Sequence, residues 1–226
     1  MVAQRIHGAD FRLHARSLHL RHVQPSPAVS MIMSFSRICH HIAVLLLLTA
    51  MASADAKSDL LIDDFSSRDG KSALGTEWRG FTDRVMGGLS DMQVGYHADE
   101  QEPVLRMTGQ VRLDNNGGFI QARVPLSSNG RLDASAFEGF RIRVRGQAGP
   151  YYLHLRSRHT WRPWQYYRAP VDVGPEWRDL LVPFSAFEGR SVRRGLDITS
   201  LESLGIVAYG EAFDAEIEVA RIELVP

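Results

Sequence analysis

Three histidines, His97, His154 and His159, are the side chains beyond residue 54 best suited to acid–base catalysis near neutral pH. None lies in a Gly-x-Ser-x-Gly, His-Glu-x-x-His or comparable hydrolytic motif. His154 stands out, because strand alternation places it on a polar side together with Tyr152 and Arg156. A structural or hydrogen-bonding role suits it better than general-base catalysis. We therefore expect no catalytic residue and predict that the protein is not an enzyme.

Several turns rich in oxygen ligands could hold calcium: Asp63-Asp64, Asp69 and Asp114-Asn115-Asn116. The spacing of an EF-hand is missing. Asp and Asn are also common in turns because they hydrogen-bond their own backbone. The glycine-containing segments lack the Lys-Ser/Thr of a phosphate-binding loop. We expect neither a metal nor a cofactor.

Two glycine pairs lie between segments that are predicted to be strands, within Asp83-Arg84-Val85-Met86-Gly87-Gly88-Leu89-Ser90 and within Asp114-Asn115-Asn116-Gly117-Gly118-Phe119. Paired glycines there indicate a sharp turn, a bulge or a close backbone approach. We expect them mainly to maintain the fold, with at least one of the first pair at positive φ. Val85 and Met86 are predicted to face the core.

The polar residues of these motifs could still contact a ligand, and Asp83 with Arg84 is the pair best placed to do so. The motif residues that are candidates for binding are Asp83, Arg84, Met86, Gly87, Gly88, Ser90, Asn116, Gly117 and Gly118.

An aromatic cluster, Trp161-Arg162-Pro163-Trp164-Gln165-Tyr166-Tyr167-Arg168, combines rings and guanidinium groups within eight residues. Such groups stack on sugars or anchor a protein partner. The alternative is that Trp164 and Tyr166 are inward-facing strand residues. We predict that Trp161, in a loop, is exposed and that Trp164 is in the core.

The elements that position these groups are strands. Phe140-Arg141-Ile142-Arg143-Val144-Arg145 alternates apolar and basic residues, which indicates a half-buried antiparallel strand. Similar patterns, separated by turn residues, predict further strands at 60–65, 92–96, 104–113, 119–124, 151–156, 178–182 and 204–209. The predicted fold class is an all-β sandwich of the jelly-roll type.

The last strand contains a slip in its alternation. Ile217 and Val219 share one phase, whereas Ala220, Ile222 and Leu224 share the other. A bulge between Val219 and Ala220 would keep both sets in the core. Short helical turns are predicted at 134–139 and 197–204, with Asp133 and Asp197 as caps.

The first 54 residues contain a predicted targeting region whose three parts match those of a secretory signal. Residues 31–54 have a basic n-region, an apolar run at 42–52 and the small residues Ala52-Ser53-Ala54, so Asp55 is the expected first mature residue. The apolar run is about half the roughly 20 residues that span a bilayer. Residues 1–30 are interpreted as an over-extended, disordered start; a mitochondrial presequence is the competing interpretation. We predict a periplasmic or secreted protein with no stable membrane span.

Beyond residue 54 about 170 residues remain, enough for a single domain at 55–226. Of 26 basic and 26 acidic side chains, 5 and 1 lie in residues 1–54, which leaves 21 basic and 25 acidic. This mildly acidic balance argues against nucleic acid as a partner. The single cysteine, Cys39, lies in the signal region, so disulfides and Cys-ligated zinc are excluded from the mature chain.

The motifs resemble those of the complex I intermediate-associated protein 30 family, which carries an Asp-x-Val-Met-Gly-Gly-x-Ser core and a downstream Asn-Gly-Gly-Phe. Further matching segments are Ile62-Asp63-Asp64-Phe65, Trp78, Phe140 to Gly146, Tyr152-Leu153, Trp177, Pro183-Phe184, Phe187 and Leu204-Gly205-Ile206. The resemblance implies a galactose-binding-like β-sandwich. For the mitochondrial members it implies an assembly factor for respiratory complex I, without known catalysis.

The expected compartment differs from that of the mitochondrial relatives, which act on the matrix side. Two functions remain open: an assembly or chaperone-type protein-binding module in the cell envelope, and a carbohydrate-binding module. In both, the partner is a protein or a glycan. We predict one basic and aromatic binding face, with the Asp83/Arg84 turn at its rim, that contains Arg141, Arg143, Tyr152, His154, Arg156 and Trp161.

Overall fold

A computed structural model describes residues 57–67, 69–98 and 102–226 of the chain. Residues Lys57–Pro226 form one compact unit. The predictions of an over-extended start at 1–30 and of a signal peptide at 31–54 lie outside the described residues. Within the described part, no helix is long and apolar enough to cross a membrane.

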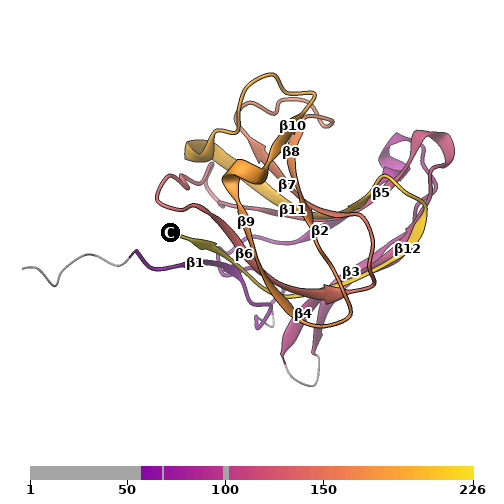
Figure 1. Ribbon diagram of the computed structural model, residues 1–226, viewed down its shortest axis with the longest axis horizontal. Helices are drawn as coiled ribbons and strands as arrows, with labels where there is room; N and C mark the ends of the chain where they lie inside the picture. Colours follow the sequence, from indigo (N-terminus) through magenta and orange to yellow (C-terminus); the bar gives the residue numbers. More distant parts are fainter. Residues whose placement is uncertain (1–56, 68, 99–101) are drawn as a thin grey trace, which may run out of the picture. The chain divides into compact units, whose positions relative to one another are not determined.

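The described chain folds into two antiparallel sheets that pack against each other (Figure 1). We name them after their central strands. The β12 sheet has the order β3 (Gln93–Ala98), β4 (Pro103–Val111), β12 (Phe213–Val225), β6 (Gly139–Gly146) and β9 (Arg178–Pro183), with β1 (Leu60–Asp63) also paired to β12. The β11 sheet has the order β10 (Glu188–Arg190), β8 (Tyr166–Val171), β7 (Tyr151–Ser157), β11 (Leu201–Tyr209), β5 (Phe119–Pro125) and β2 (Arg79–Thr82).

The core lies between the sheets, because each strand turns alternate side chains inward. In β6, Phe140, Ile142 and Val144 are fully buried, as their alternation predicts. The predicted bulge in the last strand is also confirmed. The register of β12 against β6 shifts between Val219 and Arg221, and both apolar phases of the strand are buried. The all-β jelly-roll sandwich predicted from the sequence is therefore confirmed.

The structure differs from the prediction in several short elements. Strands β2, β8 and β10 were not predicted, because Gly80, Pro170 and Gly189 interrupt their patterns. Residues 134–139 form a turn followed by the start of β6, not a helix. Asp197 caps a 3-10 turn, η4 (Ile198–Ser200), but the segment then continues as β11. The remaining 3-10 turns are η1 (Asp83–Met86), η2 (Asp114–Asn116) and η3 (Phe184–Ala186).

Candidate binding face

The side chains of the β11 sheet that point away from the core form a surface that we call the β11 face. These side chains alternate along each strand with buried residues that face the core, such as Leu153 and Leu155 in β7 and Ala169 in β8. The principal members of the face are Arg79, Phe81, Phe119, Gln121, Arg123, Tyr152, His154, Arg156, Tyr166, Arg168, Arg190 and Tyr209.

Strand pairing places part of this face in a single row across the sheet. Arg79 pairs with Arg123, Arg123 with Gly205, Gly205 with His154, and His154 with Arg168. Gly205 brings no side chain to the middle of the row, and the Gln121 side chain occupies the space over it. The row therefore has basic groups on both sides of a centre that is lined by an imidazole and a carboxamide.

Aromatic rings surround that imidazole. His154 stacks on Tyr166, with ring centroids 4.1 Å apart and an interplanar angle of 14°. Tyr152 and Tyr209 lie at 6.3 Å on its other sides, and their own centroids are 6.4 Å apart. Rings held in this way offer flat surfaces on which a ligand can stack at low entropic cost.

His154 is 7% exposed and its Nε2 atom has no hydrogen-bond partner among the described residues. Burial, together with the nearby Arg168 charge, lowers the pKa of His154 to about 3. The imidazole is thus neutral near pH 7, and its Nε2 atom is buried without a hydrogen-bond partner among the described residues. The prediction that His154 projects from the polar side of its strand with Tyr152 and Arg156 is confirmed.

Three guanidinium groups of the face, those of Arg123, Arg156 and Arg168, rest on rings or on backbone carbonyls. Arg123 lies 4.4 Å from the Phe81 ring centroid, and Arg168 lies 4.7 Å from that of Tyr152. Arg156 donates to the carbonyls of Thr160, Arg162 and Pro163. Within the described residues, no carboxylate forms an ion pair with Arg123, Arg156 or Arg168.

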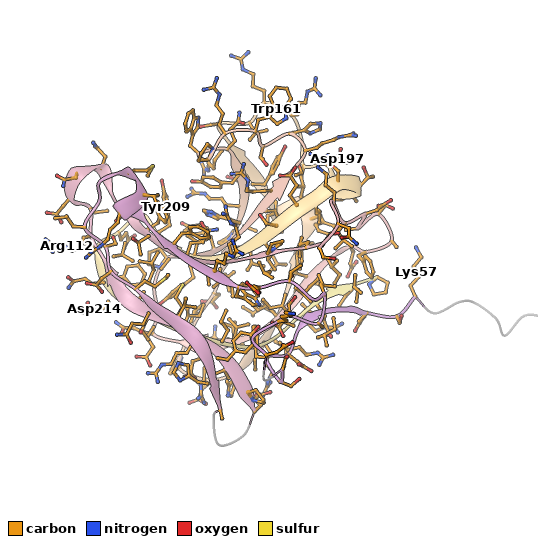
Figure 2. The ribbon with its side chains drawn as sticks, turned by 180° about the vertical axis from the view of Figure 1, so that it is seen from behind. Lys57, Arg112, Trp161, Asp197, Tyr209 and Asp214 are labelled. Atoms are coloured by element: carbon orange, nitrogen blue, oxygen red, sulfur yellow. The ribbon has the colours of Figure 1, made fainter. Side chains whose placement is uncertain are left out.

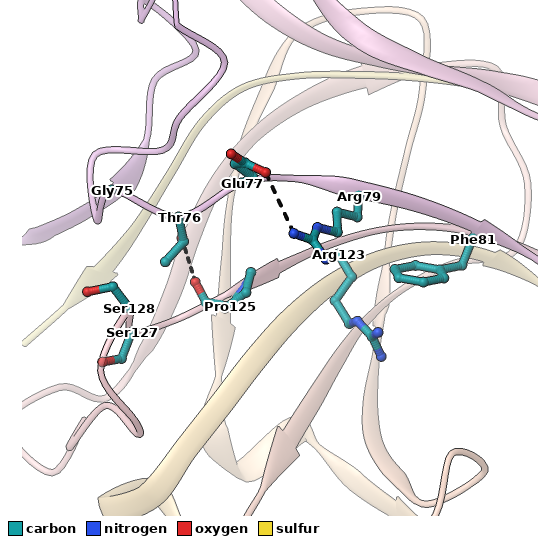
Figure 3. Close-up of a pocket in the computed structure, with 9 residues that line it drawn as sticks. All are labelled: Gly75, Thr76, Glu77, Arg79, Phe81, Arg123, Pro125, Ser127 and Ser128. Carbon is teal, nitrogen blue, oxygen red and sulfur yellow. Dashed lines mark hydrogen bonds and ion pairs between the residues drawn. The ribbon is translucent and has the colours of Figure 1, made fainter.

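Two hollows adjoin Arg123 on this face. One of about 410 Å³ runs beside Thr76, Arg79 and Phe81 (Figure 3). The other, of about 470 Å³, is lined by Arg123 together with Pro125, Arg156, Trp161, Pro163, Glu202 and Ser203. Because Arg123 and Pro125 line both, the two hollows meet along β5.

Trp161 lies in the loop between β7 and β8 and lines the second hollow. It is 85% exposed, so the prediction that Trp161 is exposed is confirmed. In the view of Figure 2, Tyr209 lies between Trp161 and Arg112. The prediction that Trp164 is in the core is wrong, since it is 54% exposed. Tyr167, not Tyr166, takes the inward phase of β8, and Trp164 precedes that strand.

The prediction of one face shared by Arg141, Arg143 and the β7 residues is wrong. Arg141 and Arg143 lie on β6, in the β12 sheet, and point to the outer side of that sheet. Arg141 pairs with Asp59 and Glu223, and Arg143 pairs with Glu102 and Asp179. Alternation along a strand shows which of its side chains point in the same direction. It does not show which sheet the strand belongs to, so it cannot place residues of two strands on one face.

Asp83 joins the two glycine motifs and is fully buried. Its carboxylate accepts hydrogen bonds from the Ser90 amide (3.0 Å), the Ser90 hydroxyl (2.5 Å) and the Gly118 amide (2.6 Å). Burial acts to raise the pKa of Asp83, but these hydrogen bonds prevail and hold it below its ordinary value. Asp83 and Ser90, itself fully buried, therefore fix the fold, and the prediction that they present polar groups to a ligand is wrong.

The glycines are needed because the backbone passes so close to this carboxylate. A Cβ atom at Gly88 would overlap Asp83 Cγ, and one at Gly117 would overlap Asp83 Oδ2. Gly87 and Gly118 have φ of 91° and 123°, so the expected positive φ in the first pair is confirmed. The motif sits directly after β2 and directly before β5, at one end of the β11 sheet.

The two apolar residues of the first glycine motif are exposed, which differs from the prediction. Val85 and Met86, expected in the core, are 72% and 61% exposed. The turn η1 ends at Gly87, so these side chains project outward from a single tight turn. Arg84 donates through Nε to the Ser90 carbonyl at 2.9 Å, and Asn116 lies in η2 at a φ of 57°.

The oxygen-rich turns considered for calcium are occupied by internal hydrogen bonds. Asp63 accepts from the Phe65 amide, from Trp78 Nε1 (2.8 Å) and from the Tyr96 hydroxyl (2.9 Å). Asp114 accepts from Arg112. In the described residues there is no group of three or more His, Cys, Asp or Glu side chains placed to hold a metal.

Comparison with solved structures identifies the fold. The domain is a galactose-binding-like β-sandwich similar to the family 11 carbohydrate-binding module of a cellulosomal cellulase of Clostridium thermocellum, with a TM-score of 0.59, 15% identity, and coverage of 76% of this chain and 96% of that chain. The same module in complex with a β-1,3-1,4-mixed-linked tetrasaccharide gives a TM-score of 0.56 at 13% identity, with 74% and 95% coverage. At these identities the likeness shows the fold.

The family follows from the sequence. Residues 64–219 match the family described as Complex I intermediate-associated protein 30 (CIA30), and the chain belongs to this family. The resemblance found in the motifs is thereby confirmed. No curated protein sequence matches the chain.

Proposed function

We propose that the protein is a non-catalytic binding module that recognises an extended ligand on the β11 face. The observation that carries the proposal is the row of guanidinium and imidazole groups across β5, β11, β7 and β8, whose charges and free nitrogen lack acidic or hydrogen-bonding partners in the described residues. A neutral, buried His154 stacked on Tyr166 is suited to contact and not to general-base catalysis at neutral pH.

A carbohydrate is the ligand class that the geometry supports best. Tyr152, Tyr166 and Tyr209 supply rings, and Gln121, whose side chain lies over Gly205, supplies a carboxamide that can hydrogen-bond sugar hydroxyls. The similar family 11 module, solved with a β-1,3-1,4-linked tetrasaccharide, supports the same class. This ligand is the alternative that the sequence left open.

An assembly or chaperone-type module that binds a protein is the second candidate, and family membership supports it. We propose a location in the cell envelope, periplasmic or secreted, on the basis of the signal-like residues 31–54. For this candidate the exposed Trp161 and the Arg156 that braces its loop would anchor the partner.

A glycan array probed with the 55–226 chain separates the two candidates. We expect glycan capture that Tyr152→Ala reduces at least tenfold, whereas Tyr96→Phe, a change in the β12 sheet, leaves it unchanged. Thermal unfolding of each variant checks that it is folded. Capture of a protein from the native envelope fraction, with no glycan bound, would favour the second candidate.

A further inference from the structure

We infer that the ligand of the β11 face is a polysaccharide that carries negative charge, as carboxylate or sulfate groups. This inference rests on the proposed function, because it assigns a chemical class to the ligand of the same face. It adds a charge requirement that a stacking platform alone does not impose.

The first argument is the state of the three central guanidinium groups. Arg123 and Arg168 contact aromatic rings and Arg156 donates to backbone carbonyls, and none of the three forms an ion pair among the described residues. Burial lowers the pKa of Arg156, and the nearby Glu202 charge offsets part of that effect. Burial lowers the pKa of Arg123, and the Arg156 charge lowers it further. Two like charges held near each other in a partly buried site favour an anion that binds both.

The acidic residues at the margin of the face form their ion pairs with arginines other than the central three, although the Glu202 charge also acts on Arg156. Glu77 lies 3.7 Å from Arg79, Glu202 lies 2.9 Å from Arg131, and Glu188 lies 3.4 Å from Arg190. The centre of the face is therefore positive, although the chain beyond residue 54 has more acidic than basic side chains. Local charge opposite to that of the whole domain is typical of a binding surface.

The second argument concerns the type of polymer. Arg123 and Arg168 are three strands apart, about 14 Å at the usual strand separation, so the charges are sparse. A nucleic acid would bring dense phosphates close to a net acidic domain. A peptide that adds a strand needs an open sheet edge, whereas these groups project from the face of the sheet.

A charged sugar chain suits every component of the row. Its carboxylates or sulfates would receive paired N–H donors from the guanidinium groups. The apolar faces of its rings would pack on the partly exposed rings of Tyr152 and Tyr209 beside the Arg168 guanidinium. The neutral His154 stacks on Tyr166 and holds that ring in place.

The test uses defined polymers and calorimetric titration with the 55–226 chain. Polygalacturonate and its methyl-esterified form share one backbone and differ in charge, and dextran sulfate and dextran do the same for sulfate. We expect each charged polymer to bind at least tenfold more tightly than its neutral counterpart. The pair that shows the difference identifies carboxylate or sulfate as the recognised group.

Matched variants locate the effect. Arg123→Gln/Arg168→Gln should weaken binding of the charged polymer at least tenfold, while Arg106→Gln/Arg221→Gln, with the same change in net charge in the β12 sheet, should change it less than twofold. Arg156 is left intact because it holds the 160–163 loop. Arg123→Lys/Arg168→Lys keeps the charge and should retain more affinity than the Gln pair; thermal unfolding confirms that each variant is folded.

Three outcomes would overturn the inference, and they differ in what they imply for the proposed function. Equal binding of neutral and charged polymers, lost in Tyr152→Ala, would leave carbohydrate binding intact and remove the charge requirement. Tighter binding of polyglutamate or of a single-stranded oligonucleotide than of either acidic polysaccharide would assign the face to another polymer. Binding of none of these polymers would defeat the carbohydrate function together with the inference.

Discussion

Arginines are present on the outer sides of both sheets, but their surroundings differ. On the β12 sheet, Arg141 and Arg143 each meet two carboxylates, and Arg145 meets Glu218 at 2.7 Å. Arg143 and Arg145 also lie over the Trp177 ring. On the β11 face, Arg123 and Arg168 likewise lie over aromatic rings, but no carboxylate among the described residues pairs with them. A stripe of basic residues in the sequence therefore does not by itself indicate a binding surface. The acidic residues on neighbouring strands, which can neutralise it, have to be known as well. The predictions below test this difference between the two sides of the sandwich.

The largest effect is expected where the end of the β11 sheet is fixed. Asp83→Ala removes the acceptor of the Ser90 and Gly118 hydrogen bonds and leaves buried donors unsatisfied. We expect a loss of about 3 kcal/mol or more in the free energy of unfolding, measured by urea denaturation. Asp114→Ala, at an exposed ion pair with Arg112, is the control and should cost less than about 1 kcal/mol.

If the two sides of the sandwich are independent, native-state hydrogen exchange of the Asp83→Ala protein should show lost protection at the start of β5 and retained protection in β6. Equal loss in both sheets would contradict that independence.

A smaller loss is expected for Gly88→Ala, because the new Cβ would overlap Asp83 Cγ. Overpacking of this kind costs about 2 kcal/mol, more than the roughly 1 kcal/mol of a change in glycine propensity. Thermal unfolding measures it. Gly195→Ala, where a Cβ meets open space, is the matched control. An unchanged melting temperature with abolished ligand binding would make the loop a contact site.

Acid should destabilise the protein through His154. Its pKa is about 3 in the folded protein against 6.5 in the unfolded chain, so the unfolded chain binds the extra proton as the pH falls below about 6.5. Stability from this group is present above pH 6.5 and is lost progressively toward pH 3, by roughly 2 kcal/mol between pH 7 and pH 4.5.

The corresponding measurement compares the pH dependence of urea denaturation for two variants. His154→Gln should flatten the dependence between pH 7 and pH 4.5, whereas His97→Gln, at an exposed position in β3, should leave it as in the parent. A parental slope in His154→Gln would show that the imidazole is accessible to protons in the folded protein.

The smallest effect on stability is expected on the outer side of the β12 sheet, where the arginines form ion pairs. Arg143→Gln removes two ion pairs that are partly exposed, and we expect a cost below about 1 kcal/mol that 1 M salt largely abolishes. Arg168→Gln should respond less to salt in stability and more in ligand binding. If Arg143→Gln weakened binding as strongly as Arg168→Gln, the contrast between the two sides would be wrong.

Much of the fold could be predicted because burial acts on alternate residues of a strand. The phase of Phe140, Ile142 and Val144, and the slip between Val219 and Ala220, are both visible in the sequence and both present in the structure. The candidate site was harder to predict. Tyr152, His154 and Arg156 share a strand, so alternation groups them, but Arg123 and Arg168 join them only through sheet pairing.

The errors have physical causes that the sequence does not display. Val85 and Met86 are apolar, and only the one-turn geometry of η1 turns them outward. Trp164 is large and aromatic, as many core residues are, but it precedes β8, which begins at Tyr166. In that strand Tyr167, and not Tyr166, faces the core. A signal for Arg123 was present in the strand pattern of 119–124, where Arg123 occupies the same phase as Gln121.

The contact of Asp83 with both glycine motifs also has an evolutionary consequence. The three atoms nearest a Cβ at Gly88 all belong to the Asp83 side chain, whereas a Cβ at Gly117 would also lie 2.9 Å from the Asp114 backbone oxygen. A lineage that replaced Asp83 with a smaller residue would relax the restriction at Gly88 but not at Gly117, so substitutions at positions 83 and 88 are expected to arise together. A double substitution of Asp83 and Gly88 should correspondingly cost less than the two single losses added.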